Sequence, residues 1–77
     1  MGGMNNRERI ARNFVKRYGR KRLERLIELL HEEVSGQAIA DEIGVSRERV
    51  RQWKNAFVQR FSYYSVYPEV QSVLEDA

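Results

Sequence analysis

The spacing of glycine and proline most constrains what this chain can fold into. Between Arg7 and Phe61 the sequence has no proline, and its only glycines are Gly19, Gly36 and Gly44. Because glycine and proline are the residues that most often end helices, these three positions divide the chain into pieces of helical length. No stretch alternates apolar and polar residues for long enough to build a sheet. The sequence therefore predicts an all-α protein.

Apolar residues repeat at helical spacing in the first two pieces. Residues 6–18 carry an apolar residue at every fourth position, at Ile10, Phe14 and Tyr18, and Gly19 can end that helix. Residues 21–34 carry apolar residues at i, i+3, i+4 and i+7, which predicts the central helix of the core. The residues of that stripe are Leu23, Leu26, Ile27, Leu30 and Val34.

Two further helix starts lie eleven residues apart. Ser35 and Ser46 each follow a valine, and each serine can accept a hydrogen bond from a free N–H of the helix that it begins. The valine before each serine can pack on an apolar residue five positions later. Eleven residues leave room for two helical turns and a tight bend at Gly44, where the backbone needs a positive φ. This spacing predicts a helix-turn-helix from about Ser35 to Phe57.

The second of these two helices has faces of different chemistry. Val50, Trp53 and Phe57 repeat at three and four and are predicted to face the core. The polar side chains of the opposite face are those that read base edges in the major groove of DNA. The residues predicted to read bases are Arg47, Glu48, Arg51, Gln52 and Asn55. The alternative is an ordinary solvated face, on which Glu48 pairs with Arg51 and Gln52.

Charge along the chain supports a polyanionic partner. Residues 1–25 hold nine Lys/Arg and two Glu, residues 26–43 hold five acids and no Lys/Arg, and residues 44–60 hold five Lys/Arg and one Glu. Two basic segments around an acidic one predict one cationic surface and an acidic back. Phosphate contacts are expected from cations and from free N–H groups at a helix start. These residues are Gly36, Gln37, Arg49, Lys54, Arg20 and Lys21. The whole basic segment from Arg7 to Arg25 either grips flanking phosphates or is a solvated amphipathic surface.

Two short runs resemble known DNA-binding families. The run from Ile43 to Gln52, Ile-Gly-Val-Ser-Arg-Glu-Arg-Val-Arg-Gln, resembles the recognition segment of region 4 of bacterial primary sigma factors, which reads the −35 promoter element. The resemblance implies that Arg47, Glu48 and Arg51, together with Gln52, contact bases and nearby phosphates. Residues 52–62 are similar to the stretch after the recognition helix in lambdoid phage CII activators, which oligomerise through a following helix. Both resemblances imply a small prokaryotic or phage transcriptional regulator.

The C-terminal segment changes character to clustered tyrosines, followed by a helix that begins near Pro68. A 77-residue domain buries only ~60% of the surface of its unfolded chain, and the absence of cysteine removes disulfides as a means of stabilising it. We therefore expect a homodimer formed through this segment, with recognition helices ~34 Å apart. The expected contacts are Tyr63, Tyr64, Tyr67, Val70 and Leu74. Stacking of the tyrosines on unpaired bases is the alternative.

Several function classes lack the residues that they need. The sequence shows no catalytic set and no glycine-rich phosphate loop, so we expect no enzyme. His31 has no second metal ligand at useful spacing, and no metal or other cofactor is expected. No apolar run reaches ~18 residues, so we expect no membrane partner and a cytoplasmic, nucleoid-associated protein.

The sequence thus predicts a bundle of four to five short helices with a helix-turn-helix of the homeodomain or sigma region 4 kind. Residues 1–5 are expected to be a disordered leader or tag, residues 6–61 the DNA-binding domain and residues 62–77 the oligomerisation element. The leading hypothesis is a transcriptional regulator that binds double-stranded DNA at specific sequences. One alternative is the DNA-recognition module of a recombinase, transposase or phage packaging protein. Another is a helical adaptor that docks on a protein such as RNA polymerase, whose affinity would resist salt.

Overall fold

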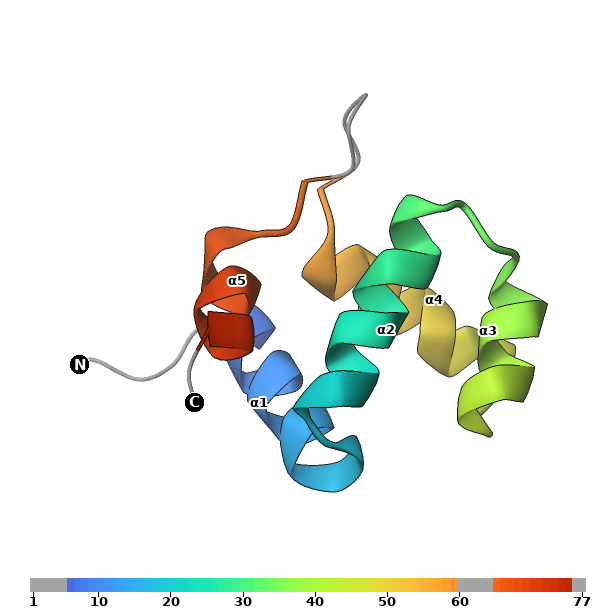
Figure 1. Cartoon of the computed structure of the whole chain (residues 1–77), viewed down its shortest axis with the longest axis horizontal. Coiled ribbons are helices and arrows are strands. Elements are labelled where there is room, and N and C mark those ends of the chain that lie inside the picture. Colours follow the sequence, from blue (N-terminus) through green and yellow to red (C-terminus); the bar gives the residue numbers. More distant parts are fainter. Residues whose placement is uncertain (1–5, 60–64, 76–77) are drawn as a thin grey trace.

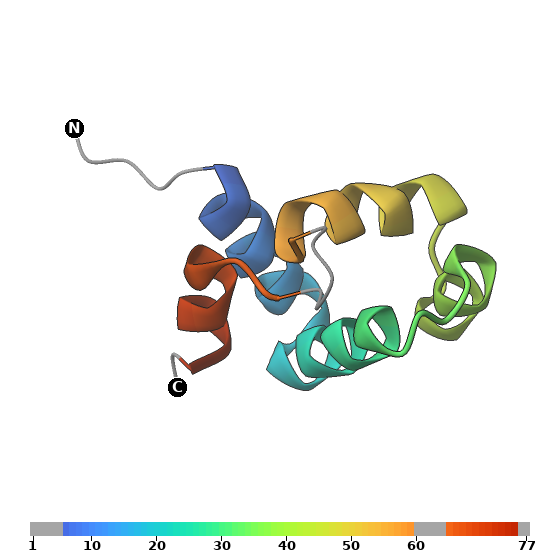
Figure 2. The same cartoon turned by 90° about the horizontal axis from the view of Figure 1, so that it is seen from above.

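A computed structural model of the chain describes residues 6–59 and 65–75. These residues form helices α1 (Asn6–Tyr18), α2 (Arg20–His31), α3 (Gly36–Ile43), α4 (Arg47–Phe57) and α5 (Pro68–Glu75). In Figure 1, α1 and α5 lie together at one end of the molecule and α3 lies at the other, with α2 and α4 between them. Seen from above in Figure 2, α2 and α4 run along opposite sides. The prediction of an all-α bundle of four to five helices is confirmed for this part of the chain.

The first helix ends where glycine was expected to end it. Gly19 has φ 96°, a left-handed conformation that glycine adopts without strain, and its N–H donates to the Val15 carbonyl at 2.8 Å. The chain reverses there, so that α1 and α2 pack against each other. Of the predicted stripe on α1, Phe14 is buried, while Ile10 and Tyr18 are half-buried and pack on the core.

Helix α2 is shorter than its apolar stripe predicted. The helix ends at His31, and Glu33 takes a left-handed φ of 58°. The Glu33 N–H then donates to the Leu30 carbonyl, and the Val34 N–H donates to the Leu29 carbonyl, both at 3.1 Å. This pair of bonds is the Schellman arrangement, which satisfies the last carbonyls of a helix. Val34 therefore lies beyond the helix end, although its side chain still packs on the core.

The C-terminal helix belongs to the same core as the rest of the molecule. Val58 pairs with Val66 in an isolated antiparallel bridge, and the Tyr67 N–H donates to the Phe57 carbonyl at 3.1 Å. These bonds bring α5 back against α1 and α2, where Val70 and Val73 are buried. No described polar or charged residue is buried, so burial of apolar surface is what holds these helices together.

Candidate nucleic-acid interface

The inner face of α4 is anchored by aromatic residues. Trp53 and Phe57 are 5% and 0% exposed. The Phe14 ring of α1 meets both edge to face, with centroid distances of 4.7 Å to Trp53 and 6.1 Å to Phe57. Such packing fixes how α4 is rotated about its axis. With Val50 also buried, the three residues predicted to face the core do so.

The outer face of α4 is open to solvent. All of the residues predicted to read bases are exposed: Arg47, Glu48, Arg51, Gln52 and Asn55. At 100° per residue the last four project from the side opposite Val50 and Phe57, while Arg47 lies at the first turn. The structure therefore brings these side chains together on one uncovered face.

A turn at Gly44 sets the position of α4 against α3. Gly44 has φ 86°, and both its N–H and that of Val45 donate to the Ala40 carbonyl, at 2.7 and 3.0 Å. Ser46 then starts α4, with its hydroxyl oxygen accepting from the Arg49 N–H at 3.1 Å. Since Ala40 is buried between the two helices, its small side chain permits their close packing. The predicted left-handed glycine and serine N-cap are confirmed.

Two grooves flank the outer face of α4. The first, here called the α3-side groove, has a volume of about 400 Å³ and an apolar floor that includes Leu30 and Ile39. Charged residues of both signs line it: Glu33, Arg47, Glu48, Arg51 and Lys54. The second, here called the α1-side groove, has a volume of about 450 Å³ and is lined by Arg49 of α4 and Arg17 of α1. Arg49 and Lys54 thus lie on opposite flanks of α4.

An ion pair occupies part of the outer face. The Arg51 Nε donates to Glu48 at 3.0 Å, and the Arg51 Nη2 donates to the other carboxylate oxygen at 2.6 Å. The hydrogen bonds from Arg51 lower the pKa of the Glu48 carboxyl below its usual value, and Glu48 in turn raises the pKa of Arg51. Both side chains are more than half exposed, so water and salt screen their attraction. The pairing that the sequence analysis named as an alternative is therefore present, in a form that costs little to open.

The start of α3 lies beside the start of α4. The Ser35 hydroxyl oxygen accepts from the Ala38 N–H at 3.2 Å, which leaves the earlier N–H groups of the helix pointing outward. A Cβ placed on Gly36 would lie 3.4 Å from the Arg47 Cγ, so the arginine stem runs over this glycine. The Gln37 side chain donates to Asp41 at 2.9 Å. Of the expected phosphate contacts, Gly36 thus joins the α4 face directly.

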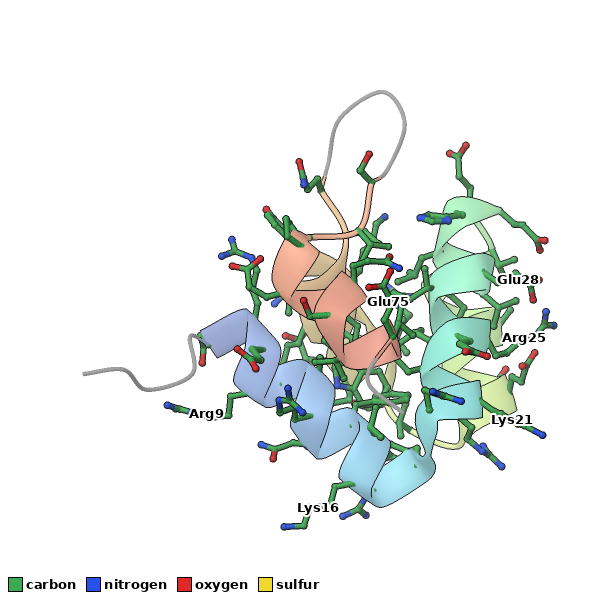
Figure 3. All side chains as sticks on the ribbon, turned by 60° about the vertical axis from the view of Figure 1, so that its left-hand side comes forward. Arg9, Lys16, Lys21, Arg25, Glu28 and Glu75 are labelled. Atoms are coloured by element: carbon green, nitrogen blue, oxygen red, sulfur yellow. The ribbon has the colours of Figure 1, made fainter. Side chains whose placement is uncertain are left out.

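The expected phosphate contacts on α2 are not brought to α4. Arg20 lies 4.0 Å from Glu24 of its own helix. Lys21 extends from the same side of α2 as Arg25 (Figure 3), and Arg25 pairs with Glu42 of α3 at 2.9 Å. Neither Arg20 nor Lys21 lines a described groove beside α4.

Residues of α1 complete the surface in their place. Asn13 and Arg17 line the α1-side groove, and Asn6 and Arg7 lie beside Gln52 at the other end of α4. Sequence spacing puts Asn13 and Arg17 on one face of α1. Spacing does not reveal that this face borders α4, so the sequence alone does not identify Asn13 and Arg17 as part of the surface.

The C-terminal residues expected to form a dimer have different surroundings. Tyr63 and Tyr64 lie outside the described residues. Val70 is fully buried within its own chain, which corrects the expectation that it contacts a second one. The Arg7 guanidinium lies over the Tyr67 ring at 3.9 Å, and Tyr67 and Leu74 are half-buried.

Other kinds of site find little support in the part of the chain that the structure describes. Residues 6–59 and 65–75 contain no cluster of three or more side chains placed to hold a metal ion. No helix among them has the length and apolar character needed to cross a membrane. No protein-family model, curated protein or solved structure matches the chain.

Proposed function

We propose that this chain is a transcriptional regulator that binds double-stranded DNA at specific sequences. In this proposal α3 and α4 form a helix-turn-helix, and α4 enters the major groove, which is wide enough to admit a helix. The observation that carries the proposal is the division of α4 into a buried aromatic face and an exposed face of long polar side chains.

The chemistry of the exposed face supports base reading. Arginine can bond two acceptors of guanine, while glutamine and asparagine can each bond two atoms of adenine. Arg51, Gln52 and Asn55 present all three groups on successive turns of one face. The Glu48–Arg51 pair would have to open or to act as a unit on the bases. Because both side chains are exposed, either change costs little free energy.

The flanks of α4 support positioning on the DNA backbone. A helix in the major groove has one phosphate chain on each side, and phosphate contacts set its register. Arg49 stands on one flank of α4 and Lys54 on the other. The N–H groups at the start of α3, beside Arg47, add partial positive charge on the second flank.

The test is selection of bound duplexes from a pool of random DNA, followed by affinity measurements at increasing salt. The proposal predicts an enriched motif and affinity that falls steeply as salt rises. An inverted repeat in that motif would support the further proposal of a homodimer, whose contacts would include Tyr67 and Leu74 but not Val70. Recovery of unenriched sequence, or salt-resistant binding, would contradict sequence-specific DNA binding.

A further inference from the structure

The α1-side groove is lined by two arginines from different helices. Arg17 of α1 and Arg49 of α4 both line this groove, which has a volume of about 450 Å³. Asn13 and Ser46 add an amide and a hydroxyl to the same lining. Arg17, Arg49, Asn13 and Ser46 are thus among the lining side chains that can donate hydrogen bonds to a ligand in the groove.

Acidic side chains are missing from the described lining of the α1-side groove. The described residues that line the α1-side groove include neither Asp nor Glu, whereas Glu33 and Glu48 line the α3-side groove. Arg17 and Arg49 are exposed, and neither forms an ion pair with any residue in the described ranges. Arg17 makes only a distant contact with the Tyr18 ring, at 5.6 Å. The α1-side groove is thus a concave, cationic surface that can accept an anion.

Four other arginines of the basic segment are already engaged. Arg12 pairs with Glu8, Arg20 with Glu24 and Arg25 with Glu28 and Glu42. Arg7 lies over the Tyr67 ring. Among the described basic residues of α1 and α2, Arg17 and Arg7 both lie beside α4 without an acidic partner, but Arg7 is engaged by the Tyr67 ring and only Arg17 lines the α1-side groove.

We propose that Arg17 and Arg49 together bind one phosphate of the DNA backbone, on the flank of α4 that faces α1. This inference rests on the proposed function, because a phosphate reaches the groove only when α4 lies against DNA. Two guanidinium groups can surround a phosphate with several charge-assisted hydrogen bonds. The proposal makes α1 a part of the DNA-binding surface and assigns Arg17, rather than the whole basic segment, to phosphate binding.

Three single variants of equal charge test this site. Arg17→Gln, Arg49→Gln and the control Lys16→Gln each remove one positive charge, and Lys16 extends into solvent from the same helix as Arg17 (Figure 3). Affinity is measured for a selected site and for a random-sequence duplex of about 30 base pairs over a range of salt concentrations. Circular dichroism melting checks that each variant remains folded.

The proposed phosphate site predicts how much DNA affinity each variant loses. Arg17→Gln should weaken binding about 3- to 10-fold on both duplexes and reduce the slope of log affinity against log salt by about 0.9. Lys16→Gln should leave that slope unchanged. The double variant Arg17→Gln/Arg49→Gln should weaken DNA affinity by a smaller factor than the product of the two single fold-losses, because both side chains bind the same phosphate.

The outcomes separate this inference from the proposed function. Equal effects of Arg17→Gln and Lys16→Gln, in a chain that binds DNA, would overturn the phosphate site and leave the function standing. Fully multiplicative losses in the double variant would overturn the shared phosphate. Failure of the unaltered chain to bind either duplex would overturn both proposals.

Discussion

Helices α4 and α5 both bury one apolar face, but their outward faces carry opposite charge. In α4, Val50, Trp53 and Phe57 are buried, and the charged residues of the helix are four cations and one acid. In α5, Val70 and Val73 are buried, and the charged residues are the acids Glu69 and Glu75. The outward face of α4 is cationic and that of α5 is acidic, so of these two helices α4 is the one that suits a polyanion.

Helix α5 also helps to hold α4 in position through the shared core. Helix α5 packs on α1 and α2, while α1 packs on α4 through Phe14. The core that holds α4 in position therefore includes the residues of α5. Under the proposed function, α5 contributes to DNA binding through stability, whereas the outer face of α4 contributes through contact.

The largest expected effect is on stability and comes from α5. Val70→Asp places a charge at a fully buried position and should lower the free energy of unfolding by about 3–5 kcal/mol. The exposed Ser72→Asp, on the same helix, is the control and should change stability little. Urea unfolding followed by circular dichroism measures both. A loss that appears only at high protein concentration would instead place Val70 in an interface between chains.

The next effect is on binding and comes from α4. Arg51→Ala should weaken affinity for the selected site by about 5- to 150-fold if this side chain pairs with a base. Affinity for random DNA should change much less, and the fold should be unaffected because Arg51 is exposed. Arg9→Ala, which removes the same charge from the solvent side of α1 (Figure 3), is the matched control. Equal losses on selected and random DNA would show that Arg51 contacts only phosphate.

A smaller effect concerns how the two helices begin. The Ser46 hydroxyl caps α4, whereas α5 begins at Pro68. Ser46→Ala should cost about 1 kcal/mol of stability, because the Arg49 N–H loses its hydrogen bond. Ser72→Ala, at an exposed position within α5, should cost nothing. Thermal unfolding of the two variants compares them, and equal melting temperatures would argue against the cap.

The smallest effect is a titration on the outer face of α4. Because Arg51 lowers the pKa of Glu48, the ion pair is intact above the usual carboxyl pKa and is lost as pH falls through the lowered value. NMR titration of the Glu48 carboxyl should show a pKa below the usual value of a glutamate, and Arg51→Gln should raise that pKa back toward the usual value. An unchanged pKa in the variant would mean that the pair does not persist in solution.

Local signals in the sequence predicted much of the fold. Gly19 and Gly44 adopt the left-handed conformations expected of them, and Ser35 and Ser46 cap the two helices that they precede. These features depend on a few neighbouring residues, so they can be inferred without the rest of the chain. The end of α2 could not be inferred in this way, because the residue with positive φ that ends it is Glu33, and glutamate has no special preference for that conformation.

The candidate site divides in the same way. The exposed face of α4 follows from helical periodicity, and every residue predicted for base reading lies on the exposed surface. The phosphate contacts expected on α2 were assigned from charge alone, and Arg20 and Lys21 lie on another part of the molecule. Charge along a sequence identifies a cation but not the surface to which folding brings it.

By itself, the sequence determined where most helices begin and end and which side of α4 turns inward, because hydrogen bonding and burial of apolar side chains act over short spacings. Only the tertiary structure decided that Val70 belongs to the core and that Arg17 and Arg49 line the same groove. Both depend on how distant helices pack, since the reversal at Gly19 and the return of the chain beyond Val58 set which faces meet.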